Sequence, residues 1–110
     1  MTDQGKKYLS DILASIELIE EFSANINSFE SYQSDLKTQS AVERQLGIIG
    51  EAVNKFDVLF PNKTLESARQ IVGLRHRLIH AYDSIDNSII WAIIKKYLIL
   101  LKNEVIDRMK

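Results

Sequence analysis

The chain has 110 residues, of which 45% are hydrophobic, and a net charge of −1 from 14 basic and 15 acidic residues. This length fits a single domain, residues 1–110, with enough apolar side chains for a core. The lack of cysteine excludes disulfides, thiolate metal sites and cysteine nucleophiles. The balanced charge excludes a general basic surface, so a nucleic acid would have to bind at a local site.

Nothing in the sequence is typical of a membrane or secreted protein. The N-terminal residues 1–7 are not followed by a clean apolar run, so no signal peptide is expected. The longest apolar stretch, Ile89–Leu101, is interrupted by two lysines and is too short to span a bilayer. We therefore expect a cytoplasmic protein without membrane association.

Helices are favoured throughout, because the chain has one proline and four glycines. Residues 8–22 carry apolar side chains at helical spacing, and Thr2 or Asp3 would cap this first helix. Residues 25–28 predict a break, and residues 29–36 predict one or two short helical turns. The apolar positions of the first helix are Leu9, Ile12, Leu13, Ile16 and Ile19.

A second long helix has a heptad-like apolar seam, which is typical of packing against antiparallel neighbours. Ser40 with Glu43 forms a capping-box pattern at its start, although Thr38 is an alternative cap. Residues 61–63, Pro-Asn-Lys, end this helix in a turn. The seam consists of Val42, Leu46, Ile49, Val53, Phe56 and Phe60.

Two glycines lie inside this second helix, at positions 47 and 50. Each costs about 1 kcal/mol of helix stability relative to alanine. Close approach of another backbone is the usual reason for such glycines, so we expect one here.

The last predicted helix runs from Asn87 to about Met109, with Asp86 as its cap. Its apolar residues lie on more than one side, which indicates a helix buried on both sides. One side would face the core, and we expect the other to be a subunit interface, unless this is simply the central helix of the bundle. Together these patterns predict an all-α, up-down bundle of four to five helices.

Residues 73–83 hold the densest set of chemically useful side chains. They include both histidines of the protein, two arginines and a tyrosine, on a helix that Thr64 would cap. On an ideal helix, one stripe of this segment is apolar and must face the core. The stripe consists of Ile71, Leu74, Leu78, Ala81 and Ile85.

The polar residues of this segment divide between the two sides of the helix. Arg75 and Tyr82 lie seven residues apart on one border of the stripe. His76 and His80 lie four residues apart on the opposite, polar side, and Arg77 lies toward the other border. Arg75 and His80 therefore point about 140° apart on a straight helix. Either the helix bends, or a two-fold dimer brings the two groups together in one cleft.

This chemistry fits RNA cleavage. An arginine offers a fork of donors to a phosphate, and a histidine can exchange the proton of a 2′-hydroxyl or of a leaving oxygen. Spacing alone favours a plainer interpretation, in which the side chains lie on the surface and Arg75 or Arg77 pairs with Asp83 or Asp86. The pair His76 and His80 resembles half of a metal site, but Arg77 is a poor neighbour for a cation, so no metal is expected.

The stretch from Arg75 to Tyr82 resembles the Arg-x4-His-x-Tyr motif of the HEPN superfamily, and within it the HepT-like toxins. HEPN motifs commonly carry a polar residue directly after the arginine, as His76 does here, although the HepT-like pattern more often has asparagine. The resemblance extends over nearly the whole chain. It includes residues 8–13, 38–46, 48–53, and 85–86 leading to Ile90 and Trp91.

The resemblance implies a HEPN-like helical bundle that forms a homodimer. It implies a metal-independent endoribonuclease without cofactor, the toxin of a two-gene system, with Arg75 and His80 as catalytic pair. His76 and Arg77 are further candidates for catalysis or RNA contact, with His76 as a candidate to share the role of His80. The implied partner is a minimal nucleotidyltransferase antitoxin, which would transfer AMP to Tyr82 and so block the site beside Arg75.

Two interpretations without catalysis stand beside this one. In the first, the protein is an interaction module that binds a nucleotidyltransferase, and the Arg75–His80 pair has no catalytic role. In the second, the chain is a purely structural helical dimer with His76 and His80 as surface residues.

Overall fold

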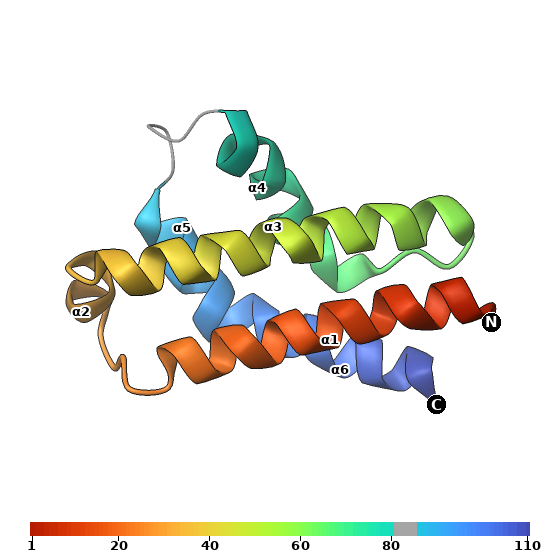
Figure 1. The fold of residues 1–110 in the computed structure, drawn as a ribbon, viewed down its shortest axis with the longest axis horizontal. Helices are drawn as coiled ribbons and strands as arrows, with labels where there is room; N and C mark the ends of the chain where they lie inside the picture. Colours follow the sequence, from red (N-terminus) through yellow and green to blue (C-terminus); the bar gives the residue numbers. More distant parts are fainter. Residues whose placement is uncertain (81–85) are drawn as a thin grey trace.

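In the computed structural model, which describes residues 1–80 and 86–110, every regular element is helical. Of residues 75–80 it describes the backbone alone. The predicted all-α fold is confirmed (Figure 1). The elements are α1 (Asp3–Ser23), α2 (Phe29–Gln33), α3 (Leu36–Leu59), the 3-10 helix η1 (Glu66–Ala68), α4 (Arg69–His80), α5 (Asn87–Ala92), the π-helical turn η3 (Ile93–Tyr97) and α6 (Leu98–Met109).

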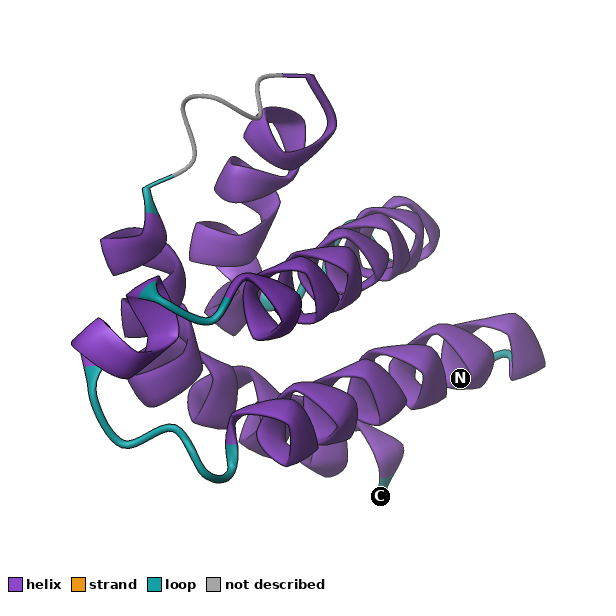
Figure 2. Ribbon diagram, turned by 60° about the vertical axis from the view of Figure 1, so that its left-hand side comes forward, coloured by secondary structure: helices purple, strands orange, loops and turns teal. Residues whose placement is uncertain are grey.

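The long helices α1 and α3 form the central antiparallel pair, and the other helices pack around it (Figures 1 and 2). Four of the five apolar positions predicted for the first helix are fully buried, and so is the second-helix seam as far as Phe56. Phe60 is half-buried and packs on the Phe56 ring, with 4.8 Å between the ring centroids. The hydrophobic periodicity therefore located the core of this pair correctly.

The predicted caps have mixed outcomes. Thr2 caps α1, because its hydroxyl accepts a hydrogen bond from the Gly5 backbone N–H at 3.0 Å. The predicted start of α3 at Ser40 or Thr38 is wrong, since the helix begins one turn earlier. Asp35 is the cap, accepting from the Thr38 N–H at 3.0 Å and from its hydroxyl at 2.7 Å. These bonds, the backbone one first, lower the pKa of the Asp35 carboxyl.

The glycines of α3 differ from each other in their surroundings. Gly50 is buried, whereas a Cβ atom at Gly47 would meet no atom within 4 Å. The predicted close approach of another backbone is therefore wrong for Gly47 within the described part of the chain.

The predicted last helix contains one turn of different geometry. Between α5 and α6, η3 is π-helical, and the Leu98 N–H donates to the Ile93 carbonyl five residues back. The prediction of one regular helix is wrong at this turn, and the core spacing gives the reason. Ile93 and Leu98 are both buried but lie five positions apart, whereas residues on one side of a regular helix recur every three or four positions. The π turn contains one extra residue, so both side chains can face the core. The buried positions are Ile90, Ile93, Leu98, Leu101 and Val105.

The outer side of α6 carries exposed apolar side chains, as the two-sided pattern predicted. These are Ile99, Leu100, Ile106 and Met109, each 37% or more exposed. The subunit interface expected on this side stays a prediction. Within residues 1–80 and 86–110, no helix has both the length and the apolar character needed to cross a membrane.

Candidate functional site

Helix α4 carries the predicted site residues. Arg75, His76, Arg77 and His80 all lie on it, and the predicted helix is confirmed for the backbone as far as His80. Their side chains lie outside the described residues, and so does Tyr82 together with the rest of 81–85. Of the predicted apolar stripe, Ile71 and Leu74 are buried at 0% and 3% exposure. The buried side of α4 is therefore the predicted one over its first two turns.

The start of this helix is held by a side chain from the far end of the sequence. The two Glu104 carboxylate oxygens accept from the backbone N–H groups of Glu66, at 3.1 Å, and Ser67, at 2.9 Å. These donors open η1, which leads directly into α4, and a negative charge at this helix end is favourable. The predicted cap by Thr64 is wrong, because its hydroxyl donates to the Glu66 carboxylate instead, at 3.0 Å.

Arg108 completes this attachment one turn further along α6. Its guanidinium donates to the carbonyl oxygens of Lys63 and Thr64, the latter at 3.0 Å, and to Glu104 at 3.2 Å. Both side chains are largely buried, with 28% of Arg108 and 17% of Glu104 exposed. Helix α6 therefore fixes the turn before α4 through charge-assisted hydrogen bonds.

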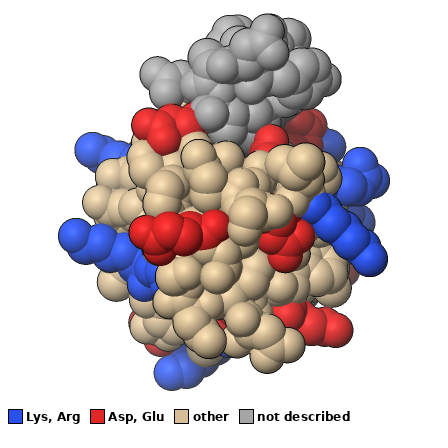
Figure 3. Space-filling model, turned by 90° about the vertical axis from the view of Figure 1, so that its left-hand side faces the viewer, with Lys and Arg blue, Asp and Glu red and all other residues tan. Residues whose placement is uncertain are grey.

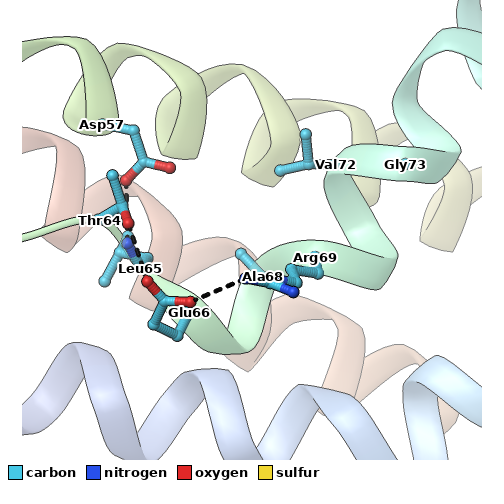
Figure 4. Close-up of a pocket in the computed structure, with 8 residues that line it drawn as sticks. All are labelled: Asp57, Thr64, Leu65, Glu66, Ala68, Arg69, Val72 and Gly73. Carbon is cyan, nitrogen blue, oxygen red and sulfur yellow. Dashed lines mark hydrogen bonds and ion pairs between the residues drawn. The ribbon is translucent and has the colours of Figure 1, made fainter. Parts of the chain in front are cut away.

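A pocket of about 420 Å³ lies between α3 and the first turns of α4, close to this attachment (Figure 4). Asp57 enters it from α3, and its Oδ1 accepts from the Leu65 N–H at 3.0 Å. Figure 4 shows the second carboxylate oxygen of Asp57 turned toward the open space before Val72. The lining consists of Asp57, Thr64, Leu65, Glu66, Ala68, Arg69, Val72 and Gly73.

Burial and neighbouring charges in this pocket shift the pKa of the Asp57 carboxyl. Burial raises the pKa of the Asp57 carboxyl, and the nearby charges of Glu104 and Glu66 raise it further. The Leu65 hydrogen bond and Arg108 oppose this effect without cancelling it. A negative charge at Asp57 is therefore costly in the folded protein.

We expect the variant Asp57→Asn to change how stability depends on pH. A carboxyl with a raised folded pKa contributes stability that is fully present below the unfolded pKa, about 3.9, and lost as the pH rises through the folded pKa. The wild type should therefore lose stability relative to Asp57→Asn between pH 3 and pH 7. Melting temperatures of both proteins across this range measure the difference. A difference that stays constant with pH would contradict the assigned shift.

At the start of α5, a buried glutamine ties this helix to α2 and α3. The Gln39 side chain, 7% exposed, donates to the carbonyl oxygens of Tyr32 at 2.8 Å and Gln33 at 2.9 Å. Its own oxygen accepts from the Asn87 amide at 3.4 Å. Asp86 caps α5 as predicted, accepting from the Ser88 N–H at 2.9 Å. These hydrogen bonds hold the start of α5 against α2 and α3.

A buried tyrosine lies beside this attachment. The Tyr32 ring is fully buried and packs on Trp91, with 5.6 Å between the ring centroids. Its hydroxyl has no hydrogen-bond partner among the described residues, and burial raises its pKa. Burial also raises the pKa of Glu43, a half-buried residue of α3. No sequence pattern marked Tyr32, because a lone tyrosine at an apolar position does not reveal whether its hydroxyl is satisfied.

The surface charge is mixed around this end of the molecule. Figure 3 shows both acidic and basic side chains on the face seen there, with no continuous basic patch among the coloured atoms. Among the residues that the structure describes, no group of three or more histidine, cysteine, aspartate or glutamate side chains could hold a metal ion.

Comparison with known proteins gives consistent matches. The model of a family described as "Ribonuclease HepT-like" matches residues 12–107. The chain is 43% identical over 108 residues to a protein of Thermococcus cleftensis named "Probable ribonuclease HepT", and this match covers 94% of each chain. It is 38% identical over 104 residues to a protein of Methanocaldococcus jannaschii named "Putative RNase", covering 91% of this chain and 92% of the relative.

A further relative is longer than this chain. The protein of Methanocaldococcus jannaschii named "Gamma-glutamylcyclotransferase and putative RNase" is 34% identical over 111 residues, which cover all of this chain and 50% of that protein. No solved structure matches the chain.

Proposed function

This chain belongs to the family of HepT-like ribonucleases, and from that premise we propose that it is an endoribonuclease that cleaves RNA without a metal ion. The observation that carries the proposal is the placement of Arg75 and His80 on one helix, α4, whose start is anchored by Glu104. Anchoring matters because positioning a catalytic group is a large part of its contribution to the rate.

The proposed reaction is a transphosphorylation. His80 takes the proton of a 2′-hydroxyl as that oxygen bonds to the adjacent phosphorus. The bond from phosphorus to the 5′-oxygen breaks, and this oxygen receives a proton from a second histidine, His76 or a histidine of another copy of the chain. Arg75 binds the phosphate and stabilises the charge that builds up on it. The products are a 2′,3′-cyclic phosphate and a free 5′-hydroxyl.

We further propose that the working unit is a homodimer with the α4 helices facing each other. On one straight helix the directions of Arg75 and His80 differ by roughly 140°, so a second copy is the simplest way to complete the site. Apolar side chains are also exposed on α6, a different helix, and their burial in a contact between copies would favour self-association.

The proposed regulation uses a partner enzyme. A minimal nucleotidyltransferase, the antitoxin of the same two-gene system, would transfer AMP from ATP to the hydroxyl of Tyr82 and release pyrophosphate. Tyr82 lies only seven positions after Arg75 in the sequence, so a phosphate added to its hydroxyl would compete for the arginine. The protein would then act as a toxin only when unmodified.

The test of this function is cleavage of single-stranded RNA by the purified protein in the presence of EDTA, with identification of the product ends. Cyclic phosphate ends are expected, and a complete absence of cleavage would overturn the proposal. Co-expression with the product of the neighbouring gene, followed by the intact mass of this chain, tests the regulation. A stable complex without cleavage at any protein concentration would favour the non-catalytic interaction module.

A further inference from the structure

The pocket between α3 and α4 has no part in the proposed cleavage step, although it opens on the same helix. We propose that it binds one unpaired RNA base, a guanine, next to the phosphate that is cleaved. This inference rests on the proposed ribonuclease function. It adds a specificity-determining residue, Asp57, to that function.

The polar group that faces the pocket is a hydrogen-bond acceptor. Oδ1 of Asp57 is held by the Leu65 N–H, and Oδ2 has no donor within the described structure. Glu66 lines the same pocket, and the Glu104 charge acts on Asp57. This carboxylate-rich site repels a phosphate but favours a base edge that presents N–H groups. Carboxylates read bases in this way, by accepting hydrogen bonds from exocyclic amino groups.

The opposite wall can hold the flat face of a base. The Arg69 side chain is 82% exposed, and its one ion pair among the described residues is a long one with Glu66, at 3.4 Å. Its guanidinium is therefore available to stack on a base, as arginine does in single-stranded RNA recognition. Val72, 40% exposed, adds an apolar contact. A Cβ atom at Gly73 would meet nothing within 4 Å, so the space above this residue is open.

The pocket lies at a suitable distance from the predicted catalytic positions. His76 and His80 follow Gly73 by three and seven residues on α4. On a regular helix these positions share one side and lie about 4.5 and 10.5 Å further along the axis. A base in the pocket would therefore belong to a nucleotide close to the one whose 2′-hydroxyl reacts.

Guanine fits this arrangement better than the other bases. Its Watson–Crick edge presents two neighbouring N–H donors, from N1 and from the 2-amino group, and the Asp57 carboxylate can accept both in parallel, one at the free Oδ2 and one at the second lone pair of Oδ1. Adenine and cytosine present one amino group beside an acceptor, and the acceptor would face the negative charge. The volume of about 420 Å³ lies within the usual range of small-ligand pockets, roughly 300–1,000 Å³.

The experiment compares cleavage of short single-stranded RNAs that differ at one position, which holds guanine, inosine, adenine or uracil. The wild type should cleave beside guanine about tenfold faster than beside inosine, which lacks the 2-amino group. In Asp57→Asn the side-chain oxygen can still bind the Leu65 N–H, but a donor replaces the free acceptor. This variant should lose the preference, so that it cleaves beside guanine, inosine and adenine at similar rates.

Two further variants test whether the preference for guanine depends on the pocket. Gly73→Leu, which fills the pocket from an open helix position, should lose the preference as well. Asp11→Asn removes a carboxylate from a surface ion pair on α1 and should keep it. Equal cleavage beside all four bases by the wild type would overturn the base pocket while leaving the ribonuclease function in place.

If the wild type cleaves none of the RNAs, the proposed ribonuclease function is wrong. The affinity of the protein for the same RNAs then tests the proposed base pocket separately. Fluorescence anisotropy should still give about tenfold tighter binding of the guanine-containing RNA by the wild type than by Asp57→Asn. Equal affinities would overturn the pocket as well.

Discussion

Replacing Arg75 or His80 with alanine is expected to reduce RNA cleavage by a factor of about 10² to 10⁴, the usual contribution of a catalytic acid, base or phosphate ligand. The measurement is the rate of cyclic phosphate formation in EDTA, with thermal melting to show that each variant remains folded. Lys7→Ala, which removes an exposed cation on α1, is the control and should leave the rate unchanged. Wild-type rates in both variants would contradict the site.

His76→Ala separates the roles of the two histidines. A loss as large as that of His80→Ala would make His76 the second proton-transfer group, whereas a loss of a few-fold would limit it to contact with RNA.

Mixing the two inactive variants tests the composite site directly. In a dimer of one Arg75→Ala chain and one His80→Ala chain, one cleft combines an intact Arg75 from one copy with an intact His80 from the other. Random exchange of chains should restore about a quarter of the wild-type rate. About half of the dimers are mixed, and in each mixed dimer one of the two clefts is complete. No recovery, with exchange verified by mass, would place both residues in a site within one chain.

Glu104→Ala is expected to lower the free energy of unfolding by about 2 kcal/mol. The substitution leaves the N–H groups of Glu66 and Ser67 without their acceptor and removes the charge that Arg108 contacts. Equilibrium unfolding in urea measures the loss. Because these bonds hold the start of α4, the cleavage rate should also fall, and by more than the smaller amount of folded protein explains.

Two comparisons make the Glu104 result specific. Glu104→Gln keeps one side-chain oxygen as acceptor and should lose less stability than the alanine variant. Glu21→Ala, at an exposed position near the end of α1, should be close to wild type in stability and rate. Equal stability of Glu104→Ala and wild type would show that water replaces the carboxylate without cost.

The sequence predicted those parts of the molecule that depend on local periodicity. Apolar spacing located the buried sides of α1, α3 and the first turns of α4, and Ile71 and Leu74 are buried as expected. Local capping chemistry identified Thr2 and Asp86 correctly. The motif from Arg75 to Tyr82 was recognisable because its residue types and spacing are specific. Its catalytic geometry stays a prediction.

Features that depend on distant segments could not be predicted in this way. Glu104 lies 38 positions after the Glu66 N–H that it accepts from, so no local pattern connects them. Thr64 had the right residue type and position for a cap, but a stronger, charged acceptor from α6 takes its place. The pocket beside Asp57 likewise exists only once α3 and α4 are packed together.

The π turn at Ile93–Tyr97 has a consequence for comparing chain lengths within the family. A one-residue insertion or deletion in a regular helix rotates everything after it by about 100° and would turn Leu101 and Val105 out of the core. At this turn an extra residue is already absorbed without rotating α6. Relatives whose last helix differs in length by one residue can therefore share the same core, provided that the difference falls within this turn.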